Sequence, residues 1–320
     1  MPAEWEHQSC VQLTWPHKDT DWAPILPEIT AVYKEIAREI SKREDLLIVA
    51  PEGVQANVQC PTNDTWARDH GFITVEQTSD IRHQTSDIIL LDFCFNGWGE
   101  KFEATLDNQI NRHLYEQGLL KGTYEDHLDF VLEGGSIESD GKGTIFTTTC
   151  CLMAPHRNQS LSQQQIEDRL KLWLGAERII WLNHGSLIGD DTDGHIDTLV
   201  RICPNDTLLY IGGDDDHPDL YEMEKELQAL RTLDRRPYRL LRLPLPRPIY
   251  DGVDRLPATY ANYLVINGAV LCPTYAQPNL DAEALRIIGE AFPDRDIVGI
   301  DCRPVIRQHG SLHCCTMQYY

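Results

Sequence analysis

Positive charge and long apolar segments are both scarce in this sequence. Its 28 lysines and arginines are outnumbered by 50 aspartates and glutamates, which gives a net charge of −22 at pH 7. Such a balance disfavours binding to nucleic acid and to acidic membranes, whereas it would attract small cations to an acidic cleft. No run of about 18 apolar residues occurs, and the first ten residues, MPAEWEHQSC, lack the basic and apolar segments of a secretory signal. We therefore expect no membrane span and a cytoplasmic location.

Paired cysteine motifs are also missing. Ten cysteines occur in 320 residues, but none are spaced as CxxC, and the chain is far larger than the small domains that depend on disulfides. We therefore expect most of the cysteines to be reduced. An HExxH motif is absent as well. A zinc site that uses the adjacent His313 and Cys314 is an alternative, but such a pair rarely supplies two ligands to one metal, so neither a metal ion nor an organic cofactor is expected.

What the sequence does contain is a repeated order of predicted elements. Apolar runs and amphipathic segments follow one another as strand, strand, helix and strand. The first set covers residues 129–134, 144–149, 161–174 and 178–182, and the second covers 196–202, 207–213, 220–230 and 238–243. A third set begins at 263–272, where Asn267-Gly268 is a strong hairpin signal. It continues with a helix over 281–292, with Asp281 as its N-cap, and a strand over 296–300.

Two further sets are less complete. Residues 71–75 and 88–95 predict strands and 104–117 predict a helix, with no clear final strand. The N-terminal part predicts strands over 10–15 and 46–50 around a helix over 27–42, in which Ile29, Val32, Tyr33, Ile36 and Ile40 share one face. Its missing strand could come from residues 311–319, so that the two chain ends pair and five units close a ring. We predict an α/β fold in which residues 1–320 form a single domain.

Four short segments carry the reactive side chains: TWARDHG (65–71), LEGGS (132–136), TDGHIDT (192–198) and HGSLHCCTMQ (309–318). Each places Cys, His, Asp or Glu beside glycine. These residue types suit attack on a guanidinium carbon, because a cysteine can act as nucleophile, a histidine can transfer protons, and carboxylates bind a planar cation through paired hydrogen bonds. If 196–202 is a strand, His195 and Asp197 share one face. A buried structural thiol at Cys314 and a core histidine at His195 are the alternatives.

Seven segments together resemble one known family. They are PAEWEHQS, NDTWARDHG, FNGWG, LEGGSIESDGKG, DTDGHID, YANYLVINGAVLCPTY and HGSLHCCT, and they run from residue 2 to residue 316. The sequence is similar here to the agmatine deiminase and Porphyromonas-type peptidylarginine deiminase family of the guanidine-modifying pentein superfamily. The resemblance implies a five-bladed α/β propeller of ββαβ units with pseudo-fivefold symmetry, closed by pairing of the N- and C-terminal segments.

The resemblance also implies catalytic roles. Cys314 matches the family nucleophile, and His195 matches the general acid and base that protonates ammonia and then activates water. Glu133 and Asp197 match two carboxylates among the family's catalytic residues, which surround the substrate guanidinium. Cys315 stands where the family often has an aliphatic residue, and we expect it to point away from the site in an extended segment and to pack in the core.

Three residues are expected to contact the substrate. Asp69 matches a carboxylate that binds the guanidinium, although capping of a turn is the alternative for it and for Glu133. Trp66 matches a tryptophan of the substrate channel, with core packing as the alternative. Asp191 could meet a distal amine of the substrate or lie in a solvated loop.

The resulting hypothesis is hydrolysis of agmatine to N-carbamoylputrescine and ammonia, a step toward putrescine in polyamine biosynthesis, through a cysteine-linked thiouronium intermediate. An arginine or peptidylarginine deiminase is the alternative with the same chemistry, and Arg157 or Arg255 would then be candidates to meet a substrate carboxylate. A metal-dependent hydrolase and a non-catalytic polyamine-binding protein are alternatives of other classes. The expected partner is a small cationic guanidine rather than nucleic acid or membrane, and a homo-oligomer is compatible with the sequence.

Overall fold

The computed structural model describes residues 1–80 and 85–320. The strands are β1 Cys10–Thr14, β2 Asp45–Ala50, β3 Val58–Gln59, β4 Ile73–Asp80, β5 Thr85–Cys94, β6 Thr123–Val131, β7 Glu138–Ser139, β8 Thr144–Thr148, β9 Arg178–Leu182, β10 Val200–Cys203, β11 Thr207–Ile211, β12 Arg239–Leu243, β13 Ile249–Asp251, β14 Asp254–Leu256, β15 Leu264–Ile266, β16 Ala269–Thr274, β17 Asp296–Asp301 and β18 Thr316–Tyr319. The helices are α1 Leu26–Ile40, α2 Ala67–His70, α3 Gly97–Glu100, α4 Ile110–Glu116, α5 Thr149–Leu152, α6 Gln163–Leu174, α7 Pro218–Ala229 and α8 Pro278–Ala291.

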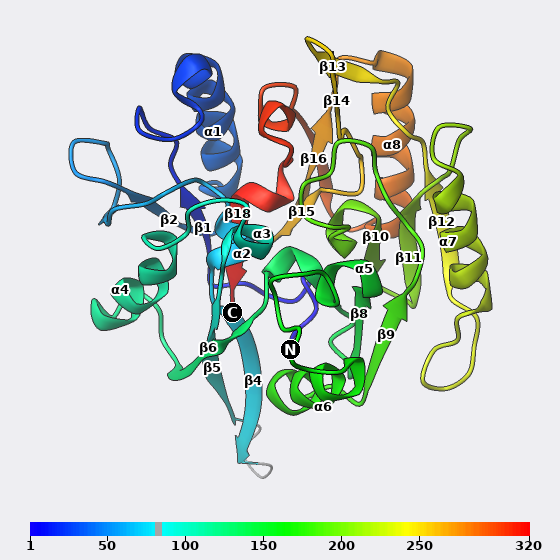
Figure 1. Cartoon of the computed structure of the whole chain (residues 1–320), viewed down its shortest axis with the longest axis horizontal. Helices are drawn as coiled ribbons and strands as arrows, with labels where there is room; N and C mark the ends of the chain where they lie inside the picture. Colours follow the sequence, from blue (N-terminus) through cyan, green and yellow to red (C-terminus); the bar gives the residue numbers. More distant parts are fainter. Residues whose placement is uncertain (81–84) are drawn as a thin grey trace.

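Five small sheets repeat one strand arrangement, in a mixed α/β fold. In the sheets β4-β5-β6, β7-β8-β9, β10-β11-β12 and β15-β16-β17, the middle strand pairs antiparallel with the strand before it and parallel with the strand after it. In the fifth sheet, β1 pairs parallel with β2 and antiparallel with β18. The long helices α1, α4, α6, α7 and α8 lie around the outside of the molecule, and the sheets lie toward its middle (Figure 1).

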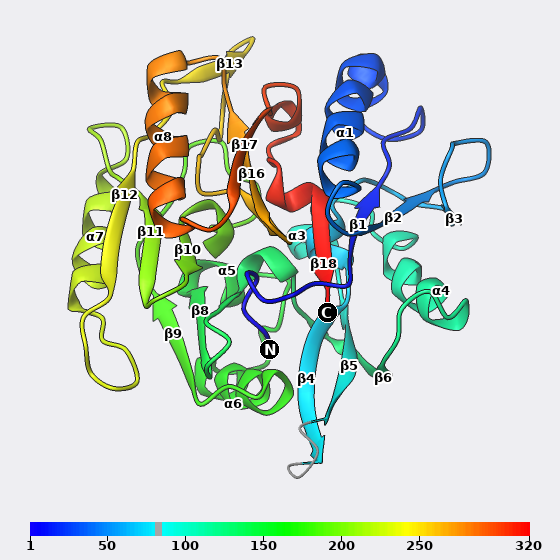
Figure 2. The same ribbon diagram turned by 180° about the vertical axis from the view of Figure 1, so that it is seen from behind.

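The two ends of the chain are joined by strand pairing. In β1 and β18, Cys10 faces Tyr319 and Leu13 faces Thr316, and both views show the two strands side by side (Figure 2). The prediction that the C-terminal segment completes the N-terminal unit is therefore confirmed, although the strand begins only at Thr316. The predicted apolar face of α1 is confirmed as well, because its five residues are all buried.

Four details of the prediction are wrong. Residues 129–131 end β6, the final strand of the preceding sheet, and the next sheet begins with the two-residue β7. The chain leaves β6 because the Asn158 side chain bonds both backbone groups of Val131. Residues 196–198 form a 3-10 turn ahead of β10, and the predicted helix over 104–117 is reduced to α4 and a short turn. The N-cap of α8 is Gln277, because Pro278 suits the first helical position, and Asp281 instead accepts from the Gln277 amide.

The buried apolar residues form two clusters. The larger includes the inner faces of α1, α7 and α8, and the smaller includes those of α4 and α6 with β4 and β5. Trp66 belongs to the larger cluster and its neighbour Ala67 to the smaller, so α2 lies where the two meet. Within the described ranges, no helix combines the length and apolar character needed to cross a bilayer.

Candidate active site

A cavity of about 220 Å³ lies against α2 and the loops that follow the sheets. Its lining residues are Asp21, Asp64, Trp66, Asp69, Trp98, Phe102, Asp191, Thr192, Gln308, His309, Gly310 and Cys314. Four of these twelve residues are aspartates, and none of the described lining residues is lysine or arginine. The concentration of one charge sign in a concave site favours a cationic ligand.

Asp69 is held rigidly at the inner end of this cavity. It lies in the single turn of α2 and is almost fully buried. Its Oδ1 accepts a hydrogen bond from the Gly135 backbone amide at 3.0 Å, and its Oδ2 accepts one from the Trp98 indole at 3.0 Å. The two bonds fix the plane of the carboxylate from opposite sides, so its orientation does not depend on a ligand.

Gly135 explains why the LEGGS segment needs glycine. A Cβ atom at this position would lie 2.6 Å from His195 Nδ1, 2.9 Å from Asp69 Oδ1 and 3.2 Å from Asp197 Oδ2. These three side chains, which come from two separate segments, therefore converge over one backbone position. No residue with a side chain fits there without moving one of them.

His195 and Asp197 are positioned by a turn rather than a strand. The Thr192 hydroxyl accepts from the His195 amide at 3.0 Å, and the Thr198 hydroxyl donates to the His195 carbonyl at 2.8 Å. These bonds hold the start of a 3-10 turn over Ile196–Thr198 that is closed by backbone hydrogen bonds. This turn corrects the predicted strand. Both side chains still reach the same site. Asp197 Oδ2 accepts from His313 Nδ1 at 2.7 Å and from Asn262 Nδ2 at 3.1 Å.

Three buried polar atoms close to Asp69 have no hydrogen-bond partner among the described residues. They are both ring nitrogens of His195 and Oδ1 of Asp197, and both residues are fully buried. An unpaired buried polar group costs roughly 1–3 kcal/mol. A guanidinium, with its planar set of N–H donors, would supply partners for the carboxylate oxygen.

The surroundings shift the pKa values of Asp69 and Asp197 in opposite directions. Burial raises the pKa of Asp69; the charge of His195 opposes this effect, and the charges of Asp197 and Glu133 add to it. Burial also acts to raise the pKa of Asp197, but the hydrogen bond and charge of His313 outweigh it, so this pKa is lowered. Of these two carboxylates, Asp197 is therefore the one that stays ionised to lower pH when no cation is bound.

Cys314 reaches the cavity from a second 3-10 turn, His313–Cys315. Its thiol lies 3.4 Å from Asn262 Oδ1. The predicted extended conformation is wrong for these residues, because the Cys315 amide bonds back to Leu312. The prediction that Cys315 packs in the core is confirmed: it is fully buried, and its thiol lies 3.4 Å from the Ser311 carbonyl and beside Tyr33.

The Cys314 thiol is neutral at physiological pH in the absence of a cation. Burial raises its pKa well above the ordinary value, and the negative charges of Asp197 and Asp69 raise it further. A cation bound between these groups would offset the negative charges of the two aspartates, lower the pKa of the thiol and favour the thiolate.

Glu133 already has a strong partner. The Arg157 guanidinium donates from Nε to both oxygens of Glu133, at 2.9 and 3.2 Å, and from Nη1 to Asp193 at 2.7 Å. Arg157 is therefore occupied by buried ion pairs and does not line the cavity, and Arg255 pairs with Asp216 outside it. Neither arginine is placed to meet a substrate carboxylate.

Aromatic side chains that sequence reasoning missed form one wall of the cavity. The Trp98 ring lies 6.3 Å from the Trp66 ring and 5.6 Å from that of Phe102. Trp98 adopts a left-handed backbone conformation between two glycines, which a sequence reveals only as the motif FNGWG. A Cβ at Gly310 would lie 2.1 Å from the Trp66 ring, so that glycine allows the loop to pack on the indole. The wall is suited to an alkyl chain or a cation.

Asp191 lies at the outer part of the cavity. Its backbone carbonyl accepts from Lys101, at 2.7 Å, and its carboxylate lies 3.8 Å from His309 Nδ1. The side chain lines the cavity yet is 46% exposed. Both expectations for this residue, a contact with a distal amine and a solvated loop, are compatible with that position.

Two groups of described residues could hold a metal ion on geometry alone: Glu133, Cys151 and His195, and Glu4, Glu138 and His313. Each group already contacts a buried guanidinium. Arg157 donates to Glu133 at 2.9 Å, and Arg201 donates to Glu4 at 2.6 Å. A divalent cation would add to positive charge that is already present, so the electrostatics of both groups suit an ion pair better than a metal.

A mixed α/β fold of small repeated sheets, with a cysteine, a histidine and carboxylates converging at the base of an acidic cavity, defines a hydrolase of the guanidine-modifying class. The comparison with known families agrees with this assignment. The chain belongs to the Porphyromonas-type peptidyl-arginine deiminase family, whose profile matches residues 1–319.

Individual relatives span the whole chain. An agmatine deiminase of Pseudomonas aeruginosa (strain LESB58) is 33% identical, with 99% of this chain and 94% of the relative covered. The structure of a C. jejuni agmatine deiminase, in which a cysteine is replaced by serine and substrate is bound, is 37% identical with a TM-score of 0.89, covering 100% and 95%. A Porphyromonas gingivalis protein provisionally described as an arginine deiminase is 48% identical with a TM-score of 0.91, covering 100% and 97%.

Proposed function

We propose that this protein is an agmatine deiminase, which hydrolyses the guanidinium group of agmatine to N-carbamoylputrescine and ammonia. The observation that carries the proposal is that Cys314 and Asp69 line a cavity whose described residues include four aspartates and no lysine or arginine. His195 and Asp197 meet Asp69 around Gly135, with His195 Nδ1 at 3.7 Å from Asp69 Oδ1. Relatives called agmatine deiminases, matched over nearly their full length, support it.

In the first half of the reaction, the Cys314 thiolate attacks the guanidinium carbon and a C–S bond forms. The C–N bond to one terminal nitrogen then breaks, and His195 gives that nitrogen the proton it needs to leave as ammonia. Asp69 and Asp197 hold the remaining planar group through their carboxylate oxygens. Because the substrate cation lies between these groups and the thiol, its binding favours the thiolate, and the thiol proton passes to His195, which later gives it to the departing nitrogen.

In the second half, water attacks the thiouronium carbon. His195 takes the proton from this water, a C–O bond forms, and the C–S bond breaks to return the Cys314 thiolate and release the ureido product. Glu133 has a carboxylate oxygen within 4.8 Å of a His195 ring nitrogen, and its ion pair with Arg157 fixes the position of this carboxylate beside the imidazole.

The ring closure, the cellular location, the pathway and the role of Trp66 are also part of this proposal. We infer that the five repeated sheets are the blades of one closed pentein ring, in which residues 1–320 form a single catalytic domain, and the β1–β18 pair supports this inference. A cytoplasmic location and a role in putrescine formation follow from the proposed reaction and stay predictions. Trp66 is proposed to contact the alkyl chain of the substrate, and the aromatic wall around it supports this role.

The proposed function is tested by measuring ureido product from agmatine, free arginine and an arginine-containing peptide under the same conditions. Product from agmatine is expected with the highest kcat/KM. Arginine carries a carboxylate that the aspartate-rich cavity would repel. A hundredfold preference requires only about 3 kcal/mol of differential transition-state binding. A better rate with arginine or the peptide would contradict agmatine as substrate and leave the guanidine chemistry intact.

Replacing Asp191 by asparagine is expected to lower kcat/KM for agmatine by roughly five- to tenfold, because the variant loses an attraction for the distal ammonium at a partly solvated position. The control substrate is n-butylguanidine, which has no ammonium, and its kcat/KM should stay unchanged. An equal loss with both substrates, or no loss with either, would remove Asp191 from the distal contact.

Prolonged treatment with a chelator is expected to leave the rate of agmatine hydrolysis unchanged. The cysteine, histidine and carboxylates account for each proton transfer and charge in the proposed reaction. The rate should be measured beside the metal content of the same sample. Activity that disappears on chelation and returns with zinc or manganese would instead favour the metal-dependent hydrolase.

A further inference from the structure

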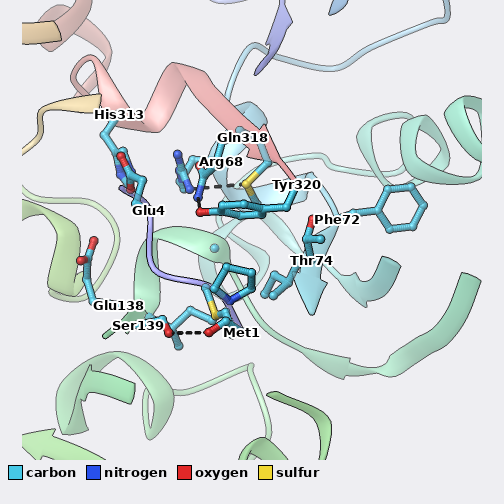
Figure 3. A pocket seen from close by; sticks show the side chains of 15 residues that line it. Met1, Glu4, Arg68, Phe72, Thr74, Glu138, Ser139, His313, Gln318 and Tyr320 are labelled. Carbon is cyan, nitrogen blue, oxygen red and sulfur yellow. Dashed lines mark hydrogen bonds and ion pairs between the residues drawn. The ribbon is translucent and has the colours of Figure 1, made fainter. Parts of the chain in front are cut away.

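The N-terminal segment reaches the back of the active site. The side chain of Glu4, which is only 10% exposed, lies against His313 beside a small second cavity of about 20 Å³ (Figure 3). Glu4 Oε2 is 2.8 Å from His313 Nε2, and Glu4 Oε1 accepts from the Val265 amide at 2.7 Å. A carboxylate at position 4 therefore contacts the residue that precedes the proposed nucleophile.

His313 links this carboxylate to Asp197. Its Nδ1 donates to Asp197 Oδ2 at 2.7 Å, and its backbone amide donates to Asn262 Oδ1 at 2.9 Å. The ring is almost completely buried, so it cannot turn away from either carboxylate without losing a buried hydrogen bond. Asp197 then has one oxygen bound by His313 and Asn262, and the other without a partner among the described residues.

Arg201 holds Glu4, which stands at the opposite end of this series of contacts from Asp197. Its Nη2 donates to Glu4 Oε2 at 2.6 Å, its Nε donates to Glu138, its Nη1 donates to the Tyr263 carbonyl, and the guanidinium lies over the Tyr263 ring. These contacts occupy all three nitrogens of Arg201. Because its three nitrogens are bound, the Arg201 guanidinium cannot move together with Glu4, and it therefore fixes the position of the Glu4 carboxylate.

The geometry also determines where the protons lie. Burial acts to raise the pKa of Glu4, but the charges of Arg201 and His313 outweigh it, and the pKa lies well below the usual range. An ionised Glu4 oxygen at 2.8 Å from His313 Nε2 requires a proton on that nitrogen. Asp197 requires one on Nδ1 as well. Arg201 Nη2 lies 3.2 Å from the same His313 Nε2, and both nitrogens contact Glu4 Oε2.

We propose that Glu4 is a positioning residue that holds His313 as a doubly protonated imidazolium, and that His313 in turn holds Asp197 ionised with its free oxygen directed at the substrate. This inference rests on the proposed function for the identity of the guanidinium that Asp197 meets. The PAEWE segment (residues 2–6) would then affect the reaction although it does not contact the substrate. The charged groups that face His313 are Asp197, Glu4, Arg201 and Glu138, and Arg68 lines the same small cavity.

The protonation state can be measured without turnover. In protein labelled with ¹⁵N-histidine, the ring nitrogens of His313 should both have protonated-type shifts at pH 7.5, with the signals assigned by their loss in His313→Gln. In Glu4→Gln, one of the two nitrogens should change to the unprotonated type. A neutral His313 ring in the unaltered protein would overturn the proposal.

Kinetics then test the effect on Asp197. Glu4→Gln should lower kcat/KM for agmatine by roughly ten- to a hundredfold, mainly through KM, because Asp197 binds the guanidinium before the reaction. Alkylation of Cys314 by neutral iodoacetamide should keep its rate, which shows that the site is still formed. The matched control is Glu6→Gln, an exposed carboxylate of the same segment, expected within threefold of the unaltered protein.

The outcomes separate the two proposals. Glu4→Gln with unaltered kcat/KM would overturn the positioning role even if agmatine is the substrate. If the unaltered protein releases no ureido product from agmatine, the proposed function fails, whereas the His313 shifts still decide whether Glu4 sets the charge of this histidine.

Discussion

Replacing Cys314 by serine is expected to reduce turnover of agmatine by at least about a thousandfold, because a serine hydroxyl is a much weaker nucleophile at neutral pH and removal of a nucleophile eliminates both half reactions. The matched control is Cys315→Ser, which changes the adjacent thiol in the core. That variant should retain most of the activity, since Cys315 does not line the cavity. Turnover is measured by ureido product, with thermal unfolding to establish that both variants fold.

Labelling locates the nucleophile directly. A cationic haloacetamidine should modify Cys314 much faster than the neutral haloacetamide of the same size, because burial and the charges of Asp197 and Asp69 hold the pKa of this thiol high until a cation binds. The preference should shrink as the pH rises, since the thiol then ionises without help. An adduct on Cys315, together with an active Cys314→Ser variant, would refute the assignment.

Replacing His195 by glutamine is expected to lower kcat for agmatine by about a hundred- to ten-thousandfold, the range that general acid–base catalysis contributes. The loss is large because the same imidazole serves ammonia departure and water attack. Haloacetamidine labelling of Cys314 should persist, since halide leaves without a proton. The quantity to measure is kcat beside the labelling rate.

His184 provides the control for this variant. It is a partly exposed histidine that pairs with Asp219 outside the cavity, and His184→Gln should stay within about threefold of the unaltered rate. If His195→Gln kept its kcat while losing only affinity, His195 would be a binding residue, and the proton transfers would have to be reassigned.

Much of the fold follows from local patterns. The short buried runs of β8, β11 and β16 and the amphipathic face of α1 are properties of short windows, so the repeated order of elements was predictable. The pairing of the chain ends also followed, from a unit that lacked one strand. The β6 to β7 boundary did not, because a two-residue strand has no period and residues 129–131 suit the end of one strand as well as the start of another.

The site was predictable as a set of segments but not as a set of contacts. Glycine-flanked Cys, His, Asp and Glu residues identify the four segments, and the glycines are explained by close approaches such as that at Gly135. The pairing of Glu133 with Arg157, and of Asp197 with His313 and Asn262, joins residues between 24 and 116 positions apart. Sequence spacing carries no information about such pairs. The two 3-10 turns were missed for a related reason: short backbone hydrogen bonds close both, and the hydroxyl bonds that hold the first turn leave no periodic pattern in the sequence.

The strand pair between β1 and β18 links activity to the closure of the chain. Cys314 lies two residues before β18, and among the described strands β18 pairs with β1, some 300 residues away in sequence. Loop closure over such a span adds little further entropy cost once the loop is long, but it cannot occur until the last strand has been synthesised. A growing polypeptide therefore acquires the thiol partner of His195 only after the other repeated sheets have been synthesised. Equally, opening of this one pair under mild denaturant would separate the thiol from the histidine while the other described sheets remain paired, so enzymatic activity should disappear before the bulk of the secondary structure.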